Sequence, residues 1–568
     1  MGVLVVILST YTAIADCTVG VVAGTASADG RPIAFKNRDF DFAYQAVSYV
    51  TGGTYRYIGI GNSGSNSPLM GLNERGLALG NSVMSNMNGG SGNVTCMDWL
   101  LKNCSTVDQC RTALRNDTYS GARPSFSLPI IGNDGKAYHI EKGASYFEYD
   151  PLDYGPTKVR KYAIIVRTNV GHQNSDGSDD STTGGIRYYE ARDHLHNAVI
   201  KNGIFDTDPS DSRGVTIDEV IKTLRWGNPG YEGDWTSATG RNCNSTSLST
   251  MIAHGVNAGE DPQIAVMWTT VYKADYVCFV PVWVALGING EIPARIANGG
   301  DATRLSYQAD RIYARKDPNN YDQYVNSRLE PMEANFIQAA ADARDRWIRY
   351  GFAYKEAKRI CTEAVETGYW TVKTIADQAQ TAPRALNETP LISQITADIQ
   401  GTAVAFSHNA TDPDGSISSV FWEFGDDSTS TNSGPGHTYK SGGTYLVMCR
   451  AIDNAGSRNS RWEYITVGST AIAAVPAAKA PELISYISAR GTVAFTARLD
   501  APGPFTLSVY TIKGSRLWEY SAAGQGSAGS LKIYWKYSSS EYRISNETCI
   551  AQLAHNGKKS VLKFAIVR

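Results

Sequence analysis

The chain has 568 residues, which at 100–200 residues per domain predicts about three to five domains. Apolar residues make up 42% and charged residues 19%, values that are typical of globular proteins and exclude intrinsic disorder for most of the chain. The formal net charge of -2 lacks the basic excess that nucleic acid or an anionic membrane surface requires, so we expect neither as a main partner.

The first 16 residues have the pattern of a secretory leader. Residues 3–8 form a short apolar run, and Ala-Ile-Ala at 13–15 has the small-x-small form of a signal-peptidase cleavage site. The run is too short to span a bilayer, and no later segment has the roughly 18 consecutive apolar residues of a transmembrane helix. We therefore expect a leader at 1–16, no membrane span, and a secreted or cell-surface protein.

The chain contains nine cysteines, an odd number that leaves at least one thiol unpaired, or paired between chains, in an exported protein. Cys17 is our candidate for that thiol. Two other interpretations stay open: a lipid anchor, which Asp16 disfavours because a small residue is wanted before a lipidated cysteine, and a plain cysteine in a first strand. No CxxC pair or His-rich spacing indicates zinc, so we expect neither a metal ion nor an organic cofactor.

Residues 17–290 mix strand-like and helical patterns and predict an α+β region. The expected strands are 17–26, 31–40, 158–169 and 263–272. The expected helices are 97–114, then 216–226 with start signals at Thr216 and Asp218, and a long helical stretch at 330–380.

Two linkers divide the rest of the chain, at 381–390 and at the Ala- and Pro-rich segment 468–482. Residues 388–468 alternate apolar and polar residues between turn clusters, as all-β sandwiches do, and residues 481–568 again contain short strands. The expected domains are therefore 17–385, with a helical extension at its end, 388–468 and 481–568.

Cys17 would gain a base if the leader were removed. A thiol is nucleophilic only as a thiolate, so it must lose its proton to a base. If Cys17 becomes the first residue, its α-amine, with a pKa of roughly 7.7–8.0, can take that proton and later give it to the leaving amine. Because Asp16 still precedes Cys17 after the expected cleavage, either autocatalytic cleavage or trimming by another peptidase is required.

Four blocks of sequence occur in one order over about 270 residues. They begin CTVGVVAGTA at 17, with Lys-Asn-Arg-Asp at 36–39, and continue with MGLNERGLALGNSVM at 70–84, RTNVGH at 167–172 and TTGGIRYYEARDHL at 182–195. Together they resemble the cysteine N-terminal-nucleophile (Ntn) hydrolases, in particular the penicillin acyltransferase-like branch. The bile salt hydrolase and penicillin V acylase branch and the secreted dipeptidase branch share these blocks. The resemblance implies a four-layer αββα sandwich.

The resemblance also implies catalytic roles by position. Cys17 would be the nucleophile and its amine the base, with Asp39 orienting that amine. Asn81 and Asn169 would donate hydrogen bonds to the oxyanion, and Arg187 would support the site electrostatically. Without the order of the blocks, the asparagines would be read as turn caps and Arg187 as a surface charge.

Three further residues are expected to contact substrate. Lys36 stands where these hydrolases usually carry Arg, and as a point charge it cannot make the bidentate fork of a guanidinium. Arg38, two residues on, would compensate. His172 follows the RTN motif and would lie near the pocket.

Two resemblances cover the later domains. DPDG at 412–415, WEFGDD at 422–427 and HTY at 437–439 resemble a PKD domain, an immunoglobulin-like sandwich that would contact a cell surface or a polysaccharide. Its acidic loops are interpreted as polar turns rather than calcium ligands. Residues 481–568, which end Lys-Phe-Ala-Ile-Val-Arg, resemble the C-terminal sorting domains of exported bacterial proteins, and the alternative is a plain accessory sandwich.

The function expected from these observations is a secreted amidohydrolase that cleaves a linear carbon–nitrogen bond through a Cys17 acyl-enzyme. Its substrate would be a small-molecule amide or a short peptide. A dipeptidase-like peptidase or an acyltransferase of the same class is one alternative, although acyl-CoA is not expected outside the cell. A non-catalytic cell-surface binding or adhesion protein is the other.

Overall fold

The computed structural model describes twenty segments of the chain. They are 17–40, 44–64, 68–84, 90–153, 163–169, 191–192, 194–195, 214–226, 243, 246–297, 301–315, 321–382, 385–468, 482–489, 492–499, 503–511, 516–526, 529–536, 548–555 and 558–565. The chain divides into two compact units, one formed by 1–199 with 213–468 and the other by 200–212 with 469–568. The predicted leader at 1–16 lies outside the described residues.

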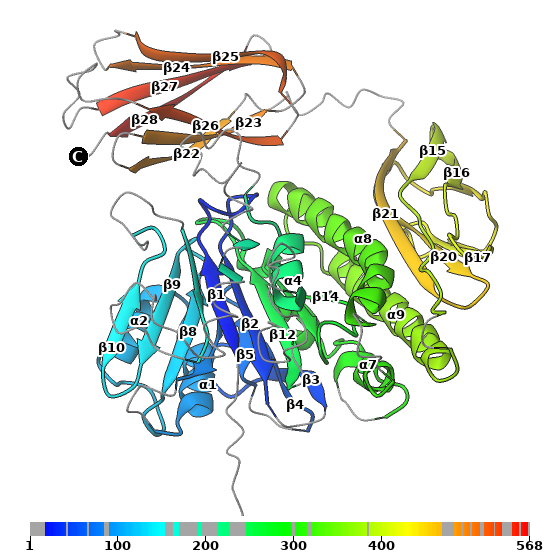
Figure 1. Cartoon of the computed structure of the whole chain (residues 1–568). Helices are drawn as coiled ribbons and strands as arrows, with labels where there is room; N and C mark the ends of the chain where they lie inside the picture. The colour runs from blue at the N-terminus through cyan, green and yellow to red at the C-terminus, as the bar shows by residue number, and fades with distance from the viewer. Residues whose placement is uncertain are drawn as a thin grey trace, which may run out of the picture. The chain divides into compact units, whose positions relative to one another are not determined.

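Strand β1 lies inside a six-stranded antiparallel sheet of the first unit (Figure 1). All residues of β1, β2 and β12 are buried, so both faces of this part of the sheet are covered. In sheet order the strands are β11 (Ile164–Arg167), β1 (Thr18–Val22), β2 (Ile33–Asp39), β12 (Ser247–His254), β13 (Val266–Thr270) and β14 (Val280–Val282). Each of the four predicted strand ranges contains one shorter observed strand, namely β1, β2, β11 and β13.

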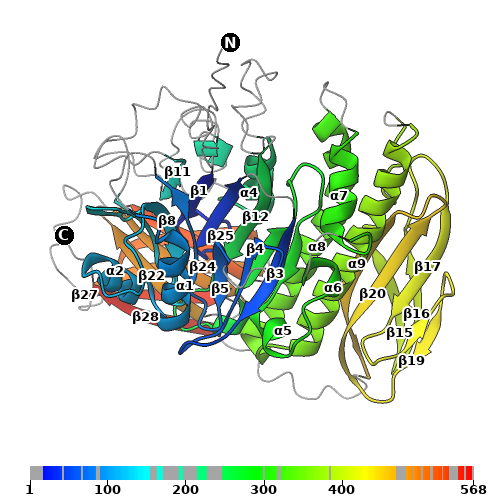
Figure 2. The same ribbon diagram turned by 90° about the horizontal axis from the view of Figure 1, so that it is seen from below.

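A second antiparallel sheet packs face to face on the first, with β1 and β2 against β8, and β12 against β5 (Figures 1 and 2). In sheet order it contains β10 (Tyr146–Tyr149), β9 (Ala137–Lys142), β8 (Phe126–Ile131), β6 (Ala78–Gly80), β5 (Met70–Asn73), β4 (Tyr57–Asn62) and β3 (Gln45–Val50), while β7 (Ser82–Val83) also pairs with β8.

Helices cover the outer faces of both sheets. On the second sheet lie α1 (Asn93–Asn103) and α2 (Val107–Arg115), and on the first lie α4 (Ile217–Trp226), α8 (Tyr321–Tyr350) and α9 (Tyr354–Ala379). Shorter helices complete the domain: α5 (Val284–Ile288), α6 (Ala294–Ala297), α7 (Leu305–Tyr313) and a 3-10 turn at Pro262–Ile264. The predicted four-layer αββα sandwich is confirmed.

Two predicted helical stretches are each split in the structure. The segment 97–114 divides at Cys104 because Thr106 caps α2, its hydroxyl accepting from the Gln109 N–H at 3.2 Å. The stretch 330–380 divides after α8, where Gly351 has φ +90° and so ends the helix in the left-handed conformation that glycine adopts without strain. Local capping therefore set helix ends that composition alone did not show.

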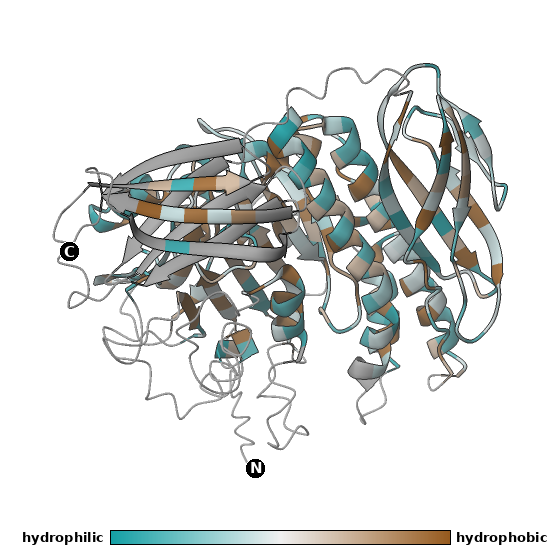
Figure 3. Ribbon diagram, turned by 90° about the horizontal axis from the view of Figure 1, so that it is seen from above, coloured by the Kyte–Doolittle hydropathy of each residue, from teal (hydrophilic) through white to brown (hydrophobic). Residues whose placement is uncertain are grey.

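Residues 387–468 form a two-sheet sandwich that belongs to the first compact unit. One sheet contains β15 (Ile395–Gln400), β16 (Ala403–His408) and β19 (Gly436–Thr438), and the other β18 (Thr429–Ser430), β17 (Ile417–Glu423), β20 (Gly443–Asp453) and β21 (Arg458–Val467). Strand β21 lies against α8 and α9, and Leu446, Met448 and Trp462 join the hydrophobic core of the helices (Figures 1 and 3). This sandwich is thus packed onto the αββα region.

The second unit is also all-β, as predicted, with two antiparallel sheets. One contains β22 (Glu482–Ala489), β23 (Thr492–Leu499) and β26 (Gly529–Lys536), and the other β25 (Arg516–Gly526), β24 (Gly503–Thr511), β27 (Thr548–His555) and β28 (Lys558–Ala565). Throughout the segments that the structure describes, no helix is both long enough and apolar enough to cross a membrane.

Candidate active site

Cys17 immediately precedes β1 and is 3% exposed, in the space between the two sheets. Its backbone nitrogen donates a hydrogen bond to Asn169 Oδ1 at 2.7 Å, although 152 residues separate the two in sequence. This contact forms because β1 pairs with β11, whose last residue Arg167 lies two positions before Asn169. Strand pairing thus brings the predicted nucleophile and one predicted asparagine together.

Lys36 faces the nucleophile from β2. The register pairs Val19 with Lys36, so the lysine side chain lies on the same face of the sheet as Val19 and Cys17. Its Nζ lies 3.5 Å from Cys17 Sγ, and it also donates to the main-chain oxygen of Asn81 and, at 3.3 Å, to Asn81 Oδ1. Burial lowers the pKa of Lys36, and the cation of Arg38 lowers it further, whereas the Cys17 thiolate and Asp39 oppose the shift.

The other face of β2 carries Asn37 and Asp39. Asp39 Oδ1 accepts a hydrogen bond from Ser247 Oγ at 2.6 Å, and Asn37 accepts one from Thr250 Oγ1. Ser247 and Thr250 lie on β12, the neighbouring strand, and were not predicted as site residues. A run of hydroxyl residues inside the otherwise apolar strand SLSTMIAH is the signal that could have found them.

Arg38 is predicted to contact substrate and here binds two amide side chains. Its Nη1 donates to Gln45 Oε1 and, at 2.7 Å, to Asn62 Oδ1, which join β2 to β3 and β4. Burial lowers the pKa of Arg38 to about 10, and the neighbouring Cys17 opposes that shift. Both partners are neutral, so the guanidinium adds positive charge beside the nucleophile.

The two asparagines are held in different ways. Asn81 follows β6 and accepts from Lys36 through its main-chain oxygen and its side chain. Asn169 uses its Oδ1 for the Cys17 nitrogen, while its Nδ2 donates to Val83 O at 2.9 Å. The next link between the same segments is Ser82 Oγ, which donates to Thr168 O at 2.9 Å. The segment after β11 is therefore fixed against β7.

A buried ion pair between the two sheets lies next to the segment after β11. Arg167 Nε donates to Glu141 Oε1 at 3.0 Å, and both side chains are fully buried. Because Arg167 is on β11 and Glu141 on β9, the pair joins the two sheets two residues away from Asn169. Sequence analysis assigned no role to either residue. Glu141 lies in a strand with no motif, and Arg167 opens the RTNVGH block, from which only Asn169 and His172 were taken as site residues.

Two predicted site residues, Arg187 and His172, lie outside the described residues. Within the described part of the chain, no three His, Cys, Asp or Glu side chains gather closely enough to hold a metal ion. The eight cysteines whose side chains are described, Cys17 among them, all carry free thiols.

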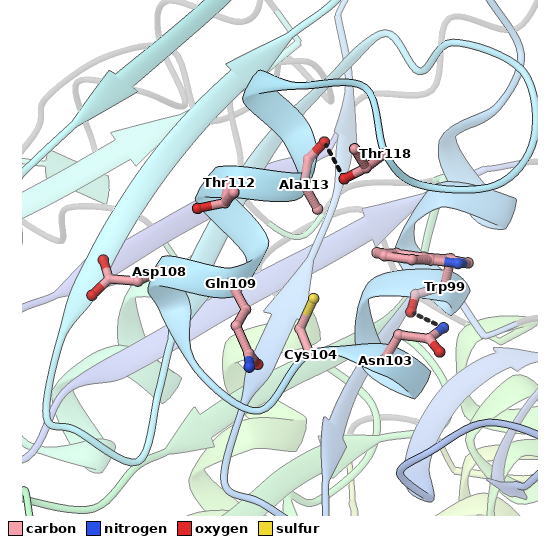
Figure 4. Close-up of a pocket in the computed structure, with 8 residues that line it drawn as sticks. All are labelled: Trp99, Asn103, Cys104, Asp108, Gln109, Thr112, Ala113 and Thr118. Atoms are coloured by element: carbon pink, nitrogen blue, oxygen red, sulfur yellow. Dashed lines mark hydrogen bonds between the residues drawn. The ribbon is translucent and has the colours of Figure 1, made fainter.

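A surface pocket lies between α1 and α2, on the outer face of the second sheet (Figure 4). It is lined by Trp99, Asn103, Cys104, Asp108, Gln109, Thr112, Ala113 and Thr118. The sheet itself separates this pocket from Cys17, which faces the space between the sheets. The pocket is therefore not part of the cluster around the nucleophile.

Comparison with known proteins identifies one region by family. Residues 387–467 match the family model of the PKD domain. The PKD1 domain of Vibrio anguillarum Epp is 26% identical, covering 14% of this chain and 95% of that domain, with a TM-score of 0.14. A microbial collagenase of Vibrio alginolyticus is 49% identical over 57 residues, which are 10% of this chain and 7% of the collagenase. The chain thus spans a small fraction of that enzyme.

Two solved hydrolases are similar to a larger part of the chain. A variant of conjugated bile acid hydrolase from Clostridium perfringens is 12% identical, covers 45% of this chain and 89% of its own, and has a TM-score of 0.29. A Caenorhabditis elegans ortholog of N-acylethanolamine-hydrolyzing acid amidase is 13% identical, covers 43% and 93%, and has a TM-score of 0.27. Scores this low add nothing to what the stacked sheets and the Cys17 cluster indicate by themselves.

Proposed function

We propose that the chain is a secreted amidohydrolase that cleaves a linear carbon–nitrogen bond through an acyl-enzyme on Cys17, once its leader has been removed. One observation carries the proposal: a buried thiol immediately before β1 has a lysine nitrogen 3.5 Å from its sulfur and an asparagine oxygen 2.7 Å from its backbone nitrogen. A cysteine in a merely structural role needs neither contact.

The chemistry begins when Cys17 becomes the first residue. Asn169 Oδ1 then holds the new α-amine by accepting one of its hydrogens, so that the amine stays beside Sγ. The amine takes the thiol proton, the thiolate attacks the amide carbon, and the amine gives the proton to the departing nitrogen. Water then hydrolyses the thioester and regenerates Cys17.

The charges around the reacting atoms favour formation of the thiolate and so favour these reaction steps. Lys36 and Arg38 are buried cations on the nucleophile's face of β2, and both stabilise a thiolate more strongly than they would in water. We assign Asn81 and Asn169 to the oxyanion, Asp39 to orientation of the α-amine, Arg187 to electrostatic support of the site, and His172 to substrate contact, as the order of the blocks implies. We assign Lys36 and Arg38 to substrate contact near the scissile bond.

The remaining parts of the chain would serve export and attachment. We assign 1–16 to a leader, 388–468 to a domain that contacts a cell surface or polysaccharide, and 481–568 to sorting or to an accessory role. The substrate would be a small amide or short peptide, and transfer of the acyl group to an amine or peptidase activity are variants of the same reaction. A non-catalytic adhesion protein is the competing function, favoured if Asp16 is retained.

The first test is the N-terminal residue of the exported protein, measured by intact mass and terminal sequencing for wild type and Cys17→Ala. We expect wild type to begin at Cys17 and to form an acyl adduct with one of a panel of fatty-acyl, aryl-acetyl and aminoacyl aminocoumarin amides. Cys17→Ala should form no adduct. A wild-type chain that begins at Asp16 and hydrolyses none of the amides would contradict the proposal and favour adhesion.

A further inference from the structure

The reaction above leaves the leader-bearing chain without a base. Before processing, the nitrogen of Cys17 belongs to the Asp16–Cys17 peptide bond, so it is an amide with no basic lone pair. Its hydrogen is donated to Asn169 Oδ1 at 2.7 Å. If Cys17 cuts that bond itself, some other group must accept the thiol proton first.

We propose that Lys36 accepts the proton of Cys17 Sγ in the leader-bearing chain, which makes it the general base for self-processing. The inference rests on the proposed role of Cys17 as nucleophile. In this step the S–H bond breaks, an N–H bond forms at Nζ, and the electron pair stays on sulfur. The products are a thiolate and an ammonium, and no further reactant is needed.

The contacts of Lys36 fit both proton states. Three acceptors surround Nζ: Cys17 Sγ at 3.5 Å, the Asn81 main-chain oxygen, and Asn81 Oδ1 at 3.3 Å. An ammonium has three N–H donors, one for each acceptor. A neutral amine keeps two donors for Asn81 and turns its lone pair to the thiol. The proton can therefore move without rearrangement of the surrounding side chains.

The electrostatic surroundings leave Lys36 as the neutral amine, the form that can accept a proton, more often than an ordinary lysine near neutral pH. The titratable and charged groups that act on it are Cys17, Arg38 and Asp39. Burial, followed by the Arg38 cation, lowers the pKa of Lys36, against the opposing effects of Cys17 and Asp39. An arginine at this position would hold the thiolate but could not accept its proton near neutral pH.

Processing then follows from the same pair. The thiolate attacks the carbonyl carbon of Asp16, a C–S bond forms and the C–N bond breaks. Nζ returns its proton to the Cys17 nitrogen, which leaves as a neutral amine. Water hydrolyses the resulting thioester, so the leader departs with a carboxylate on Asp16 and Cys17 becomes the first residue.

The test is a titration of the Cys17 thiol in chains that still carry the leader. An affinity tag ahead of the leader retains only those chains, and intact mass verifies them. The ultraviolet absorbance of the thiolate is followed against pH, and the same titration of the matched Cys17→Ser chain is subtracted. The variants are Lys36→Met, Lys36→Arg and, as a control, Lys142→Met. The control removes another buried lysine, which lies on β9 of the second sheet and pairs with Asp117 in the turn after α2.

Relative to wild type, Lys36→Met should raise the midpoint of the thiol titration by at least about one unit, since a buried thiol without a cation resists ionisation. Lys36→Arg and Lys142→Met should titrate like wild type. Both Lys36 variants should retain the leader, whereas Lys142→Met should lose it, because only a lysine at position 36 can exchange the proton.

Three results separate this inference from the proposed function. Equal midpoints for wild type and Lys36→Met, or normal processing of Lys36→Arg, would overturn the role of Lys36 while leaving amide hydrolysis by processed Cys17 intact. Loss of processing in the Lys36 variants, together with no amide hydrolysis by processed wild type, would support Lys36 and contradict the proposed function. Hydrolysis is therefore measured separately, on chains that already begin at Cys17.

Discussion

Two clusters of buried charge in the first unit differ in how their charges are compensated. Around Cys17, Lys36 and Arg38 donate to carbonyl and amide oxygens. The group in contact with Lys36 that becomes anionic is the Cys17 thiol, and Asp39 acts on Lys36 without a hydrogen bond to it. Between the helices and the PKD sandwich, Glu363 accepts from Arg450 Nε at 2.6 Å and from Ser460 Oγ at 2.5 Å. The second cluster pairs a carboxylate with a guanidinium, as structural ion pairs do.

The difference distinguishes the candidate active site around Cys17 from the interface between the helices and the PKD sandwich, which we call the joint. A buried ion pair stabilises the fold only when its partners satisfy each other, and removing one partner leaves a costly unpaired charge. A buried cation whose partners are neutral instead gains stabilisation when a nearby group becomes anionic. We therefore expect the two clusters to respond to substitution in opposite ways, in stability at one and in reactivity at the other.

The largest effect on stability is expected at the joint. Glu363→Ala leaves Arg450 without its carboxylate and should lower the free energy of unfolding by about 3 kcal/mol, as breaking a buried ion pair does. Urea denaturation checks this value, and the Cys17 titration should not change. Glu423→Ala is the matched control at the same joint. Glu423 pairs with Arg359 and is more exposed than Glu363, so its removal should lower the free energy of unfolding by less than about 1 kcal/mol. Equal losses for the two variants would contradict the distinction.

A smaller effect is expected on acidification, at a third buried cluster that ties α8 to the first sheet. Asp29 Oδ2 lies 3.0 Å from His254 Nε2 and 2.9 Å from Arg344 Nη2. Burial alone would raise the pKa of Asp29, but His254, Arg344 and Arg31 together hold it well below its usual range. Burial lowers the pKa of His254 despite the neighbouring carboxylate.

The lowered pKa values of Asp29 and His254 both make the folded chain less stable as the pH falls. Below a pH of about 6.5 the unfolded chain protonates His254 more readily than the folded chain does, and below about 4 the same holds for Asp29. The free energy of unfolding should therefore fall as the pH drops through these two ranges. Urea denaturation between pH values of about 8 and 3 measures it, and His254→Gln should remove the upper part of the loss. A flat profile between about 8 and 5 would show that His254 does not contribute.

The smallest effect on stability is expected at the site. Lys36→Met removes a buried ammonium whose partners are neutral, so the free energy of unfolding should change by less than about 1 kcal/mol. Because this variant is expected to retain its leader, amide hydrolysis is measured on Lys36→Met chains produced to begin at Cys17, where it should fall because the thiolate loses its nearest cation. A loss of stability as large as that of Glu363→Ala would make Lys36 a structural residue and remove the contrast between the clusters.

The sequence predicted the site unevenly. Cys17, Lys36, Asn81 and Asn169 were named from three of the four blocks, and the structure brings these four residues into one chain of contacts. Their roles as base, oxyanion donor or substrate contact stay predictions. Ser247, Thr250 and Glu141 lie in no motif, and Arg167 opens the RTNVGH block but was given no role. A buried hydroxyl or ion pair is recognised only by the partner that another strand supplies.

The fold, like the site, could be predicted only in part from the sequence. Apolar runs at 17–26 and 31–40 predicted strands because period and burial are properties of a short segment, and they coincide with β1 and β2. The break at Thr106 and the turn at Gly351 depend on single capping residues, which a reading of composition passes over. The attachment of the PKD sandwich to α8 and α9 could not be predicted, since nothing in an alternating strand pattern says which face another element will cover.

The sequence by itself determined four strands of the first sheet, the approximate location of the main helices, the all-β character of residues 388–468 and 481–568, and a cysteine placed to become a first residue. Only the tertiary structure decided that Lys36 faces that cysteine while Asp39 bonds to Ser247, and that Asn169 holds its nitrogen from 152 residues away. The physical reason is strand register. A shift of one residue would turn every side chain of β2 to the opposite face, and pairing between distant strands, not local pattern, fixes that choice.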